Sequence, residues 1–260
     1  MQVEAIIDHI VSWLSNYLAQ SKLKGFVVGV SGGIDSAVTS TLCAKTGSQV
    51  YTLNMPIHQA PDQISRSAKH IRWLESGYEN VQGVKIDLTS AFQSIENTLP
   101  ESIQDGLTMA NTRSRLRMVT LYAFSTHHRM LVAGTGNKVE DFGVGFYTKY
   151  GDGGVDLSPI ADLMKSEVYA LAKNMGIIEE IIQAPPTDGL WQDNRSDESQ
   201  IGATYNELEW VMAFEAGTGD EETLTARQRE VLGIYRKFNQ SNRHKMLPIP
   251  VCEIPASLKS

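Results

Sequence analysis

The chain has 260 residues, of which 42% are hydrophobic and 20% are charged, with 30 acidic against 23 basic side chains. This length allows a substantial core, and the formal charge of −7 argues against a protein that coats the nucleic-acid backbone. Cys43 and Cys252 lie far apart, which excludes a disulfide framework and a CxxC site and favours a reducing compartment. No apolar run approaches about 18 residues, so we expect no membrane span, no signal peptide and a cytoplasmic location.

The N-terminal half alternates between short apolar runs and helical patterns. Residues 3–20 carry apolar side chains at i, i+3, i+4 and i+7 spacing, which predicts an amphipathic helix. Strand character appears in four short segments, at 26–30, 50–53, 81–86 and 130–133. Helical patterns follow the strands, at 35–45, 60–75, 88–97 and 106–128. Strands that alternate with helices predict an α/β fold in which a parallel sheet is covered by helices on both faces.

The C-terminal half begins with a glycine-rich run at 143–154, which predicts a loop. Helical patterns resume at 165–175, 204–214 and 223–239. The stretch from Gly189 to Gly202 is polar and has little periodicity, so we interpret it as a mobile flap. Without a repeat or a low-complexity tract, residues 1–260 are most simply read as one domain.

The strongest local signal for function lies where the first strand passes into a helix, at Gly29-Val30-Ser31-Gly32-Gly33-Ile34-Asp35-Ser36. Glycines let successive backbone N–H groups converge on an anion, and the helix N-terminus adds partial positive charge, which together cradle a phosphate. The loop lacks the Gly-Lys-Ser/Thr ending of kinase-like loops and carries Asp35 instead. A carboxylate beside phosphates makes physical sense chiefly as a Mg²⁺ ligand. The alternative is an ordinary turn in which Asp35 caps the helix.

This loop resembles that of the ATP pyrophosphatases that form adenylates, which cleave ATP between its α and β phosphates. Three further segments resemble successive motifs of the ammonia-dependent NAD synthetases, at Asn111–Met118, Gly134–Glu140 and Thr148–Asp156. The resemblance runs from about residue 3 to 250 in the order of the family. It implies an adenine-nucleotide alpha hydrolase-like fold.

The resemblance also implies a reaction, the amidation of deamido-NAD to NAD by a ligase of the NAD synthase type. ATP would activate the carboxylate as an acyl-adenylate, and AMP and pyrophosphate would be released. Longer synthetases carry a glutaminase domain for which this chain has no room, so we expect free ammonia, or ammonia from a separate subunit. The family is dimeric, so we expect a homodimer, and we expect neither nucleic acid nor membrane as a partner.

By the same resemblance, Gly29 to Ser36 hold the phosphates of ATP, and Asp35 and Glu140 hold Mg²⁺. Asp35 and Lys165 are the expected catalytic residues, and Lys165 would neutralise the departing pyrophosphate. The other positions that match ATP contacts are Thr135 and Thr187. The positions that match deamido-NAD contacts are Arg115, Lys149, Asp156, His244 and Lys245.

Two details limit how much can be transferred from the family. On a helix, Arg113 and Arg117 share one face and Arg115 another, so one helix cannot aim all three at one ligand. The segment Gly136–Val139 departs from the commonest bacterial pattern, so only the flanking Thr135 and Glu140 keep an implied role.

Two other functions stay open. Another adenylating synthetase, such as a tRNA-modifying enzyme, would need a basic surface and, for thiolation, more cysteines. If the protein were a regulator that binds ATP without turnover, Lys165 and the segment Asn111–Met118 would have no role.

Overall fold

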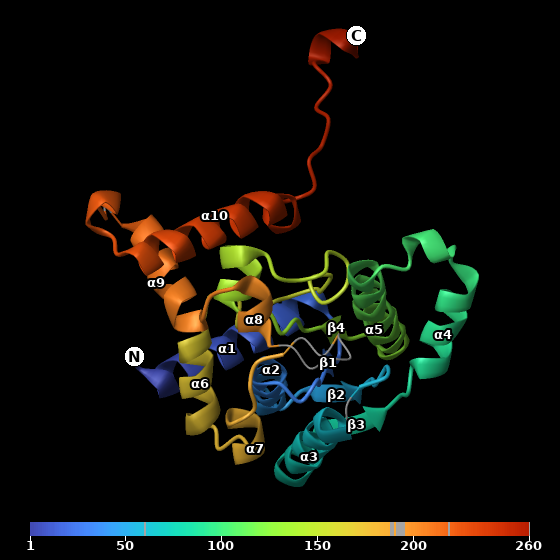
Figure 1. Ribbon diagram of the computed structural model, residues 1–260. Coiled ribbons are helices and arrows are strands. Elements are labelled where there is room, and N and C mark those ends of the chain that lie inside the picture. Colours follow the sequence, from blue (N-terminus) through green and yellow to red (C-terminus); the bar gives the residue numbers. More distant parts are fainter. Residues whose placement is uncertain (60, 188–189, 191–195, 218, 260) are drawn as a thin grey trace.

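The computed structural model describes residues 1–59, 61–187, 190, 196–217 and 219–259. Within these residues, one sheet of four parallel strands has the order β3-β2-β1-β4 (Figure 1). The strands are β1 (Gly25–Gly29), β2 (Gln49–Asn54), β3 (Val81–Lys85) and β4 (Leu131–Val132). The parallel sheet confirms the predicted α/β class.

Helices fill most of the connections between the strands and much of the C-terminal half. The α-helices are α1 (Val3–Ser21), α2 (Ile34–Lys45), α3 (Pro61–Gly77), α4 (Thr89–Thr98), α5 (Gly106–His128), α6 (Lys165–Asn174), α7 (Glu179–Ile182), α8 (Asp197–Ile201), α9 (Tyr205–Ala216) and α10 (Ala226–Met246). The shorter turns are η1 (Glu101–Ile103), η2 (Val139–Val144), which is a π-helix, η3 (Glu221–Thr223) and η4 (Ala256–Leu258).

Alternation along the strands divides the core into two layers. Phe26 and Val28 of β1 face one side, where they pack with α1, α2 and α6. Val27 faces the other side, where Phe92 of α4 and Leu121 of α5 cover it. Because successive side chains of a strand point to opposite faces, a short apolar run such as β1 needs helices on both sides.

A third cluster of buried apolar side chains joins η2 to the C-terminal helices. Val139 and Val144 of η2 pack with Leu208 of α9 and with Val231 and Tyr235 of α10. The sheet does not contribute to this cluster, which instead places η2 and the start of α9 beside the carboxyl ends of the strands.

Most predicted elements are confirmed, although several boundaries differ. The glycine-rich run is not a loop from its start, because Gly143 and Val144 still belong to η2. Helix α10 continues to Met246 rather than 239, since its last two turns are polar and hide the periodicity, and Pro248 follows shortly after.

Part of the predicted flap is described, and its mobility stays a prediction. Residues 189 and 191–195 lie outside the described residues, but 197–201 form helix α8. Ser196 accepts a hydrogen bond from the Ser199 amide at its start, and Gly202 ends it at φ +88°. A helix of five residues is too short to show a periodic pattern.

Candidate active site

The site lies at the carboxyl ends of β1 and β4, two neighbouring parallel strands. Strand β1 continues into the loop before α2, and β4 continues into the segment 134–137 before η2. From β1 the chain adds β2 and β3 on one side and then places β4 on the other side of β1, so the strand order has a switch point between β1 and β4. Open α/β sheets bind ligands at such a switch point. A cavity of about 230 Å³ opens here.

The loop between β1 and α2 is held by its own side chains. Gly32 takes φ +89°, and a Cβ there would approach the Gln63 carbonyl oxygen to 2.9 Å, so glycine is required. The Ser31 hydroxyl accepts from the Gly33 amide at 3.1 Å, and the Ser36 hydroxyl donates to the Gly33 carbonyl at 2.9 Å. The first amides of α2 have no partner four residues earlier in the helix and are available to an anion.

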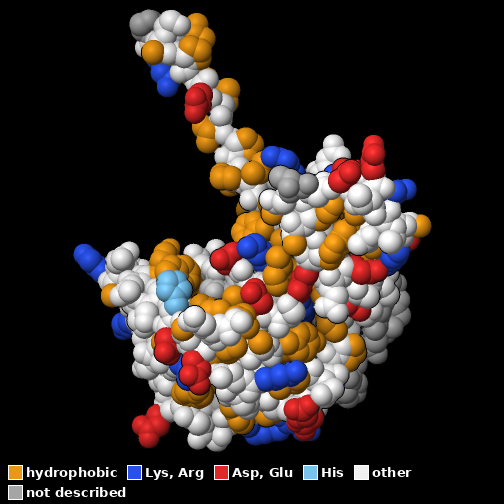
Figure 2. All heavy atoms as spheres, turned by 90° about the vertical axis from the view of Figure 1, so that its left-hand side faces the viewer, with side chains coloured by type: hydrophobic (Ala, Val, Ile, Leu, Met, Phe, Trp, Pro, Cys, Tyr) orange, Lys and Arg blue, Asp and Glu red, His pale blue; other side chains and the backbone are white. Residues whose placement is uncertain are grey.

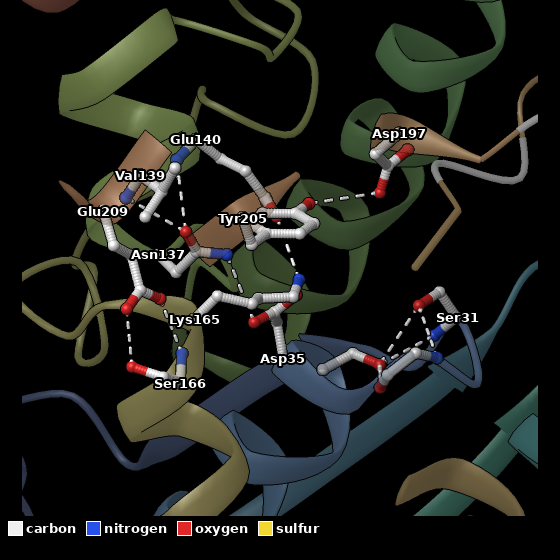
Figure 3. A network of polar contacts seen from close by, with 12 residues as sticks. Ser31, Asp35, Asn137, Val139, Glu140, Lys165, Ser166, Asp197, Tyr205 and Glu209 are labelled. Carbon is white, nitrogen blue, oxygen red and sulfur yellow. Dashed lines mark hydrogen bonds and ion pairs between the residues drawn. The ribbon is translucent and has the colours of Figure 1, made fainter. Parts of the chain in front are cut away.

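Lys165 lies at the centre of a buried polar network (Figure 3). It is the first residue of α6 and only 3% exposed. Its Nζ contacts Asp35 Oδ2 at 2.5 Å and Glu140 Oε1 at 2.9 Å. Three segments far apart in sequence therefore converge on one positive charge.

The protonation states follow from this pairing. Burial acts to lower the pKa of Lys165, but the carboxylates of Asp35 and Glu140 outweigh it and raise the pKa well above its ordinary value. Burial acts to raise the pKa of Glu140, but Lys165 and the Tyr205 hydroxyl outweigh it and lower the pKa. Burial raises the pKa of Asp35, as does Glu140, and Lys165 opposes both. The ammonium of Lys165 is thus held as a cation between the two acids.

Asn137 and Tyr205 hold these acids in place. Asn137 is fully buried, and its Nδ2 donates to Asp35 Oδ1 at 3.3 Å. Its Oδ1 accepts from the amides of Val139 and Glu140 at 3.1 Å each, which fixes the start of η2. The Tyr205 hydroxyl donates to Glu140 Oε1 at 2.6 Å, and its ring centre lies 4.7 Å from Lys165 Nζ.

A second pair of acids lines the same cavity, at Asp141 and Asp152. Asp152 Oδ1 accepts from the Ser114 hydroxyl at 2.6 Å and from the Thr148 amide at 3.0 Å. Burial and the neighbouring Glu140, Asp152 and Asp35 raise the pKa of Asp141 to about 8. The cavity therefore has a second pair of carboxyl groups beside Asp35 and Glu140, and burial favours the neutral form of both.

The structure brings together nearly all of the residues expected to bind ATP and metal. Those lining the cavity are Gly29, Val30, Ser31, Gly33, Ile34, Asp35, Ser36, Thr135, Glu140, Lys165 and Thr187. Gly32 is the exception, because it forms the turn and packs against the segment around Gln63. Thr187 accepts a hydrogen bond from Gln63 Nε2 at 3.3 Å. Their roles as ligands stay predictions.

The five residues expected to bind deamido-NAD do not line this cavity. Three of them are linked to each other, since Arg115 Nε donates to the Lys149 carbonyl at 3.2 Å and Lys149 Nζ to the His244 carbonyl at 2.8 Å. Lys245 Nζ donates to the carbonyl of Tyr147, whose side chain lines the cavity. Asp156 lies apart, where it accepts from the Val132 amide at 2.7 Å.

Among the arginines of α5, Arg117 lines the cavity, and sequence reasoning did not select it. Its Nε donates to the Met55 carbonyl at 3.0 Å. Arg113 instead lies 4.6 Å from the centre of the Phe92 ring and donates to the Leu190 carbonyl. Ser114, Arg117, Met118 and Leu121 line the cavity at helical spacing, so one face of α5 borders the site.

The donor set suits a hard cation that is shared with a substrate. Asp35 and Glu140 already converge on a positive group, and their oxygen atoms are of the type that Mg²⁺ prefers. No group of three or more His, Cys, Asp or Glu suited to a metal occurs among the described residues. Mg²⁺ commonly takes only one or two carboxylates and completes its shell with waters and substrate phosphates, so two acids suffice.

Comparisons with known proteins agree on one family. A family model for NAD synthase matches residues 6–248. The NH₃-dependent NAD⁺ synthetase of Methanosarcina acetivorans is 36% identical over 98% of this chain and 100% of its own length. The NMN synthetase of Francisella tularensis has a TM-score of 0.84 at 29% identity, covering 98% of this chain and 99% of its own. The NH₃-dependent NAD synthetase of Campylobacter jejuni, at 24% identity, has a TM-score of 0.80 over 97% of this chain and 100% of its own.

Proposed function

Because the chain belongs to the NAD synthase family, we propose how its active site performs the reaction of that family. The protein is a ligase that uses ATP and ammonia to convert the nicotinate carboxylate of deamido-NAD to the amide of NAD. A carboxylate has no usable leaving group towards ammonia, so it must first be activated. In the first step a carboxylate oxygen bonds to the α phosphorus of ATP, and the bond to the β phosphate breaks. In the second step ammonia attacks the acyl carbon, loses a proton and expels AMP.

The first step needs positive charge around the triphosphate, and two parts of the site supply it. The amides at the start of α2 donate to phosphate oxygens, and the loop from Ser31 to Ser36 is fixed before a ligand arrives. Lys165 lines the same cavity and stays positively charged, because its two carboxylate partners outweigh the effect of burial on its pKa. The observation that carries the proposal is the convergence of Lys165, Asp35 and Glu140 beside this loop.

Asp35 and Glu140 would hold Mg²⁺, which when bound supplies a charge that offsets the growing negative charge of pyrophosphate. Lys165 would then leave the two carboxylates and bind phosphate oxygens instead. Tyr205 and Asn137 would keep the two acids oriented throughout, since both donate hydrogen bonds to them.

A product assay with isotope labelling tests the mechanism. The protein, ATP, Mg²⁺, ammonium and deamido-NAD should give NAD, AMP and pyrophosphate in equal amounts. With ¹⁸O in the substrate carboxylate, one labelled oxygen should appear in AMP, because the acyl–oxygen bond breaks in the second step. Formation of ADP and phosphate, or AMP without the label, would contradict the acyl-adenylate route. Omission of ammonium is the control and should abolish NAD formation.

A second acid substrate is supported by the likeness to the NMN synthetase of Francisella tularensis at a TM-score of 0.84. The acid that corresponds to NMN, nicotinate mononucleotide, carries the same nicotinate carboxylate as deamido-NAD. The same two steps would therefore convert it to NMN. Parallel measurement of kcat/KM for the two acids decides between them. A clear preference for deamido-NAD would reject the mononucleotide as the main substrate.

The state of the protein in solution is also a proposal. We infer a homodimer from the dimeric family that the sequence resembles, and a cytoplasmic enzyme from the two separate cysteines, of which Cys43 is buried and Cys252 exposed. No described helix is both long and apolar enough to cross a membrane.

A further inference from the structure

The C-terminal segment after α10, residues 247–259, leaves the rest of the molecule as an extended arm (Figure 1). Every residue of this arm is exposed. Its apolar side chains include Ile249, Val251 and Leu258, which are 66%, 80% and 75% exposed. Figure 2 shows this row of hydrophobic side chains projecting from the body. Monomeric proteins rarely expose apolar side chains in such a continuous run.

Two prolines favour an extended backbone where the arm leaves α10. Leu247 has the extended angles φ −88° and ψ 153°. Pro248 and Pro250 fix their own φ and push Leu247 and Ile249 towards extended conformations. The arm is thus extended where it leaves α10, and its apolar side chains stay largely exposed.

Two exposed aromatic residues of the body belong to segments that contact α10. Phe142 is 53% exposed, and its carbonyl accepts from Asn239 of α10. Tyr150 is 59% exposed and follows Lys149, whose Nζ donates to the His244 carbonyl near the end of α10. The backbone at Phe142 and the segment at Tyr150 therefore lie near the C-terminal half of α10, from which the arm leaves.

This arrangement is self-complementary. A two-fold dimer needs one surface that carries both halves of the contact, so that each copy gives and receives the same group. An axis near the end of α10 would place each arm against Phe142 and Tyr150 of the other copy. The nine residues before η4, 247–255, span about 30 Å when extended, which exceeds the radius of gyration of about 18 Å expected for a chain of 260 residues. The arm is long enough to lie along a second molecule.

We propose that residues 247–259 dock on a second copy of the chain, against the surface around Phe142 and Tyr150, in a reciprocal exchange. The arm carries one acid, Glu253, and one base, Lys259, so it lacks the basic cluster that an anionic membrane attracts. Extended segments with apolar side chains at alternate positions are instead suited to protein surfaces. The proposal rests on the homodimer inferred above and names the contact that would form it.

The test uses Cys252, which is exposed on the arm, while Cys43 is fully buried. A thiol reagent therefore reports on the arm of the intact protein. Light scattering gives the mass at each concentration, and the labelling rate of Cys252 is measured across the same series. We expect a dimer in which Cys252 reacts at least ~10-fold more slowly than in the dissociated chain.

A matched pair of variants distinguishes the effect of changing the arm from the effect of removing any exposed apolar side chain. Ile254→Ser removes an isoleucine of the arm that is 47% exposed, and Ile103→Ser removes one in η1 that is 46% exposed. The dimer dissociation constant should rise ~10-fold for the first and stay unchanged for the second. Both variants should melt like the original chain when monomeric.

The outcomes distinguish the two proposals. A dimer in which Ile254→Ser has no effect and Cys252 reacts at the same rate at all concentrations would overturn the arm exchange and leave the dimer standing. A chain that stays monomeric at all concentrations would overturn both. Neither outcome would affect the product assay, which tests the reaction itself.

Discussion

From the pairing of Lys165 with two acids we predict an effect on the stability of the protein as well as on its activity. Lys165→Met keeps the length and the apolar stem of the side chain but removes its charge. Asp35 and Glu140 then face each other in a buried site without the ammonium that now lies 2.5 and 2.9 Å away. Metal-free protein should lose stability, and Mg²⁺ should restore part of it.

The magnitude follows from the geometry. At an effective dielectric constant of about 20, each contact of this length is worth about 6 kcal/mol of attraction. Desolvation of three buried charges offsets most of this, and the removal of one partner from a buried pair typically costs about 3–5 kcal/mol. For a chain of this size, that corresponds to a fall in Tm of roughly 10 °C. The loss should shrink below about pH 5, because the unpaired acids take up protons there.

Thermal unfolding in the presence of a chelator, and then with increasing Mg²⁺, measures both effects. A cation bound at about 100 times its Kd stabilises by about 2.7 kcal/mol, and Lys165→Met should gain more than the original chain because no ammonium competes with the cation. Lys138→Met is the matched control. Lys138 pairs with Asp162 at 2.8 Å on the exposed surface, so its loss should cost less than about 1 kcal/mol.

Two results would contradict this description of the buried ion pairs. If Lys165→Met is as stable as Lys138→Met without metal, then the buried pair is not the counter-ion that we describe. If Mg²⁺ stabilises the original chain and Lys165→Met equally, then the cation does not compete with Lys165 for Asp35 and Glu140.

Three further predictions concern the same network and one buried histidine. Asp35→Ala and Glu140→Ala should each lower the rate of AMP release ~100-fold while the protein stays folded, and near-normal rates would remove the metal assignment. Tyr205→Phe should cost about 1–3 kcal/mol in urea unfolding, because Glu140 loses its 2.6 Å hydrogen bond; an unchanged midpoint would contradict this. Burial lowers the pKa of His70 to about 4 from its ordinary 6.5, so the unfolded chain takes up the proton first. Stability should therefore fall as pH drops from about 6.5 to 4, by at most about 3 kcal/mol, and His70→Gln should flatten that slope in unfolding measured at pH 7 and 4.5.

The phosphate loop and the fold class could be predicted from local sequence. The alternation of apolar runs and helical patterns requires only neighbouring residues, and the loop at Ser31 to Ser36 is one contiguous segment. The face of α5 that lines the cavity is harder to predict from the sequence. Its periodicity separates Arg115 from Arg117, but only the packing of the helix against Met55 shows that Arg117 is the one that lines the cavity.

The sequence by itself determined which elements form and where phosphate-binding chemistry lies, because helix, strand and turn propensities act over a few residues. The tertiary structure alone decided that Lys165 lies between Asp35 and Glu140, and that Tyr205 and Asn137 orient those acids. These contacts join positions that are up to 130 residues apart. Such distances are closed by the packing of α6 on α1 and α2 and of α9 on α6 and η2, and no local pattern encodes that packing.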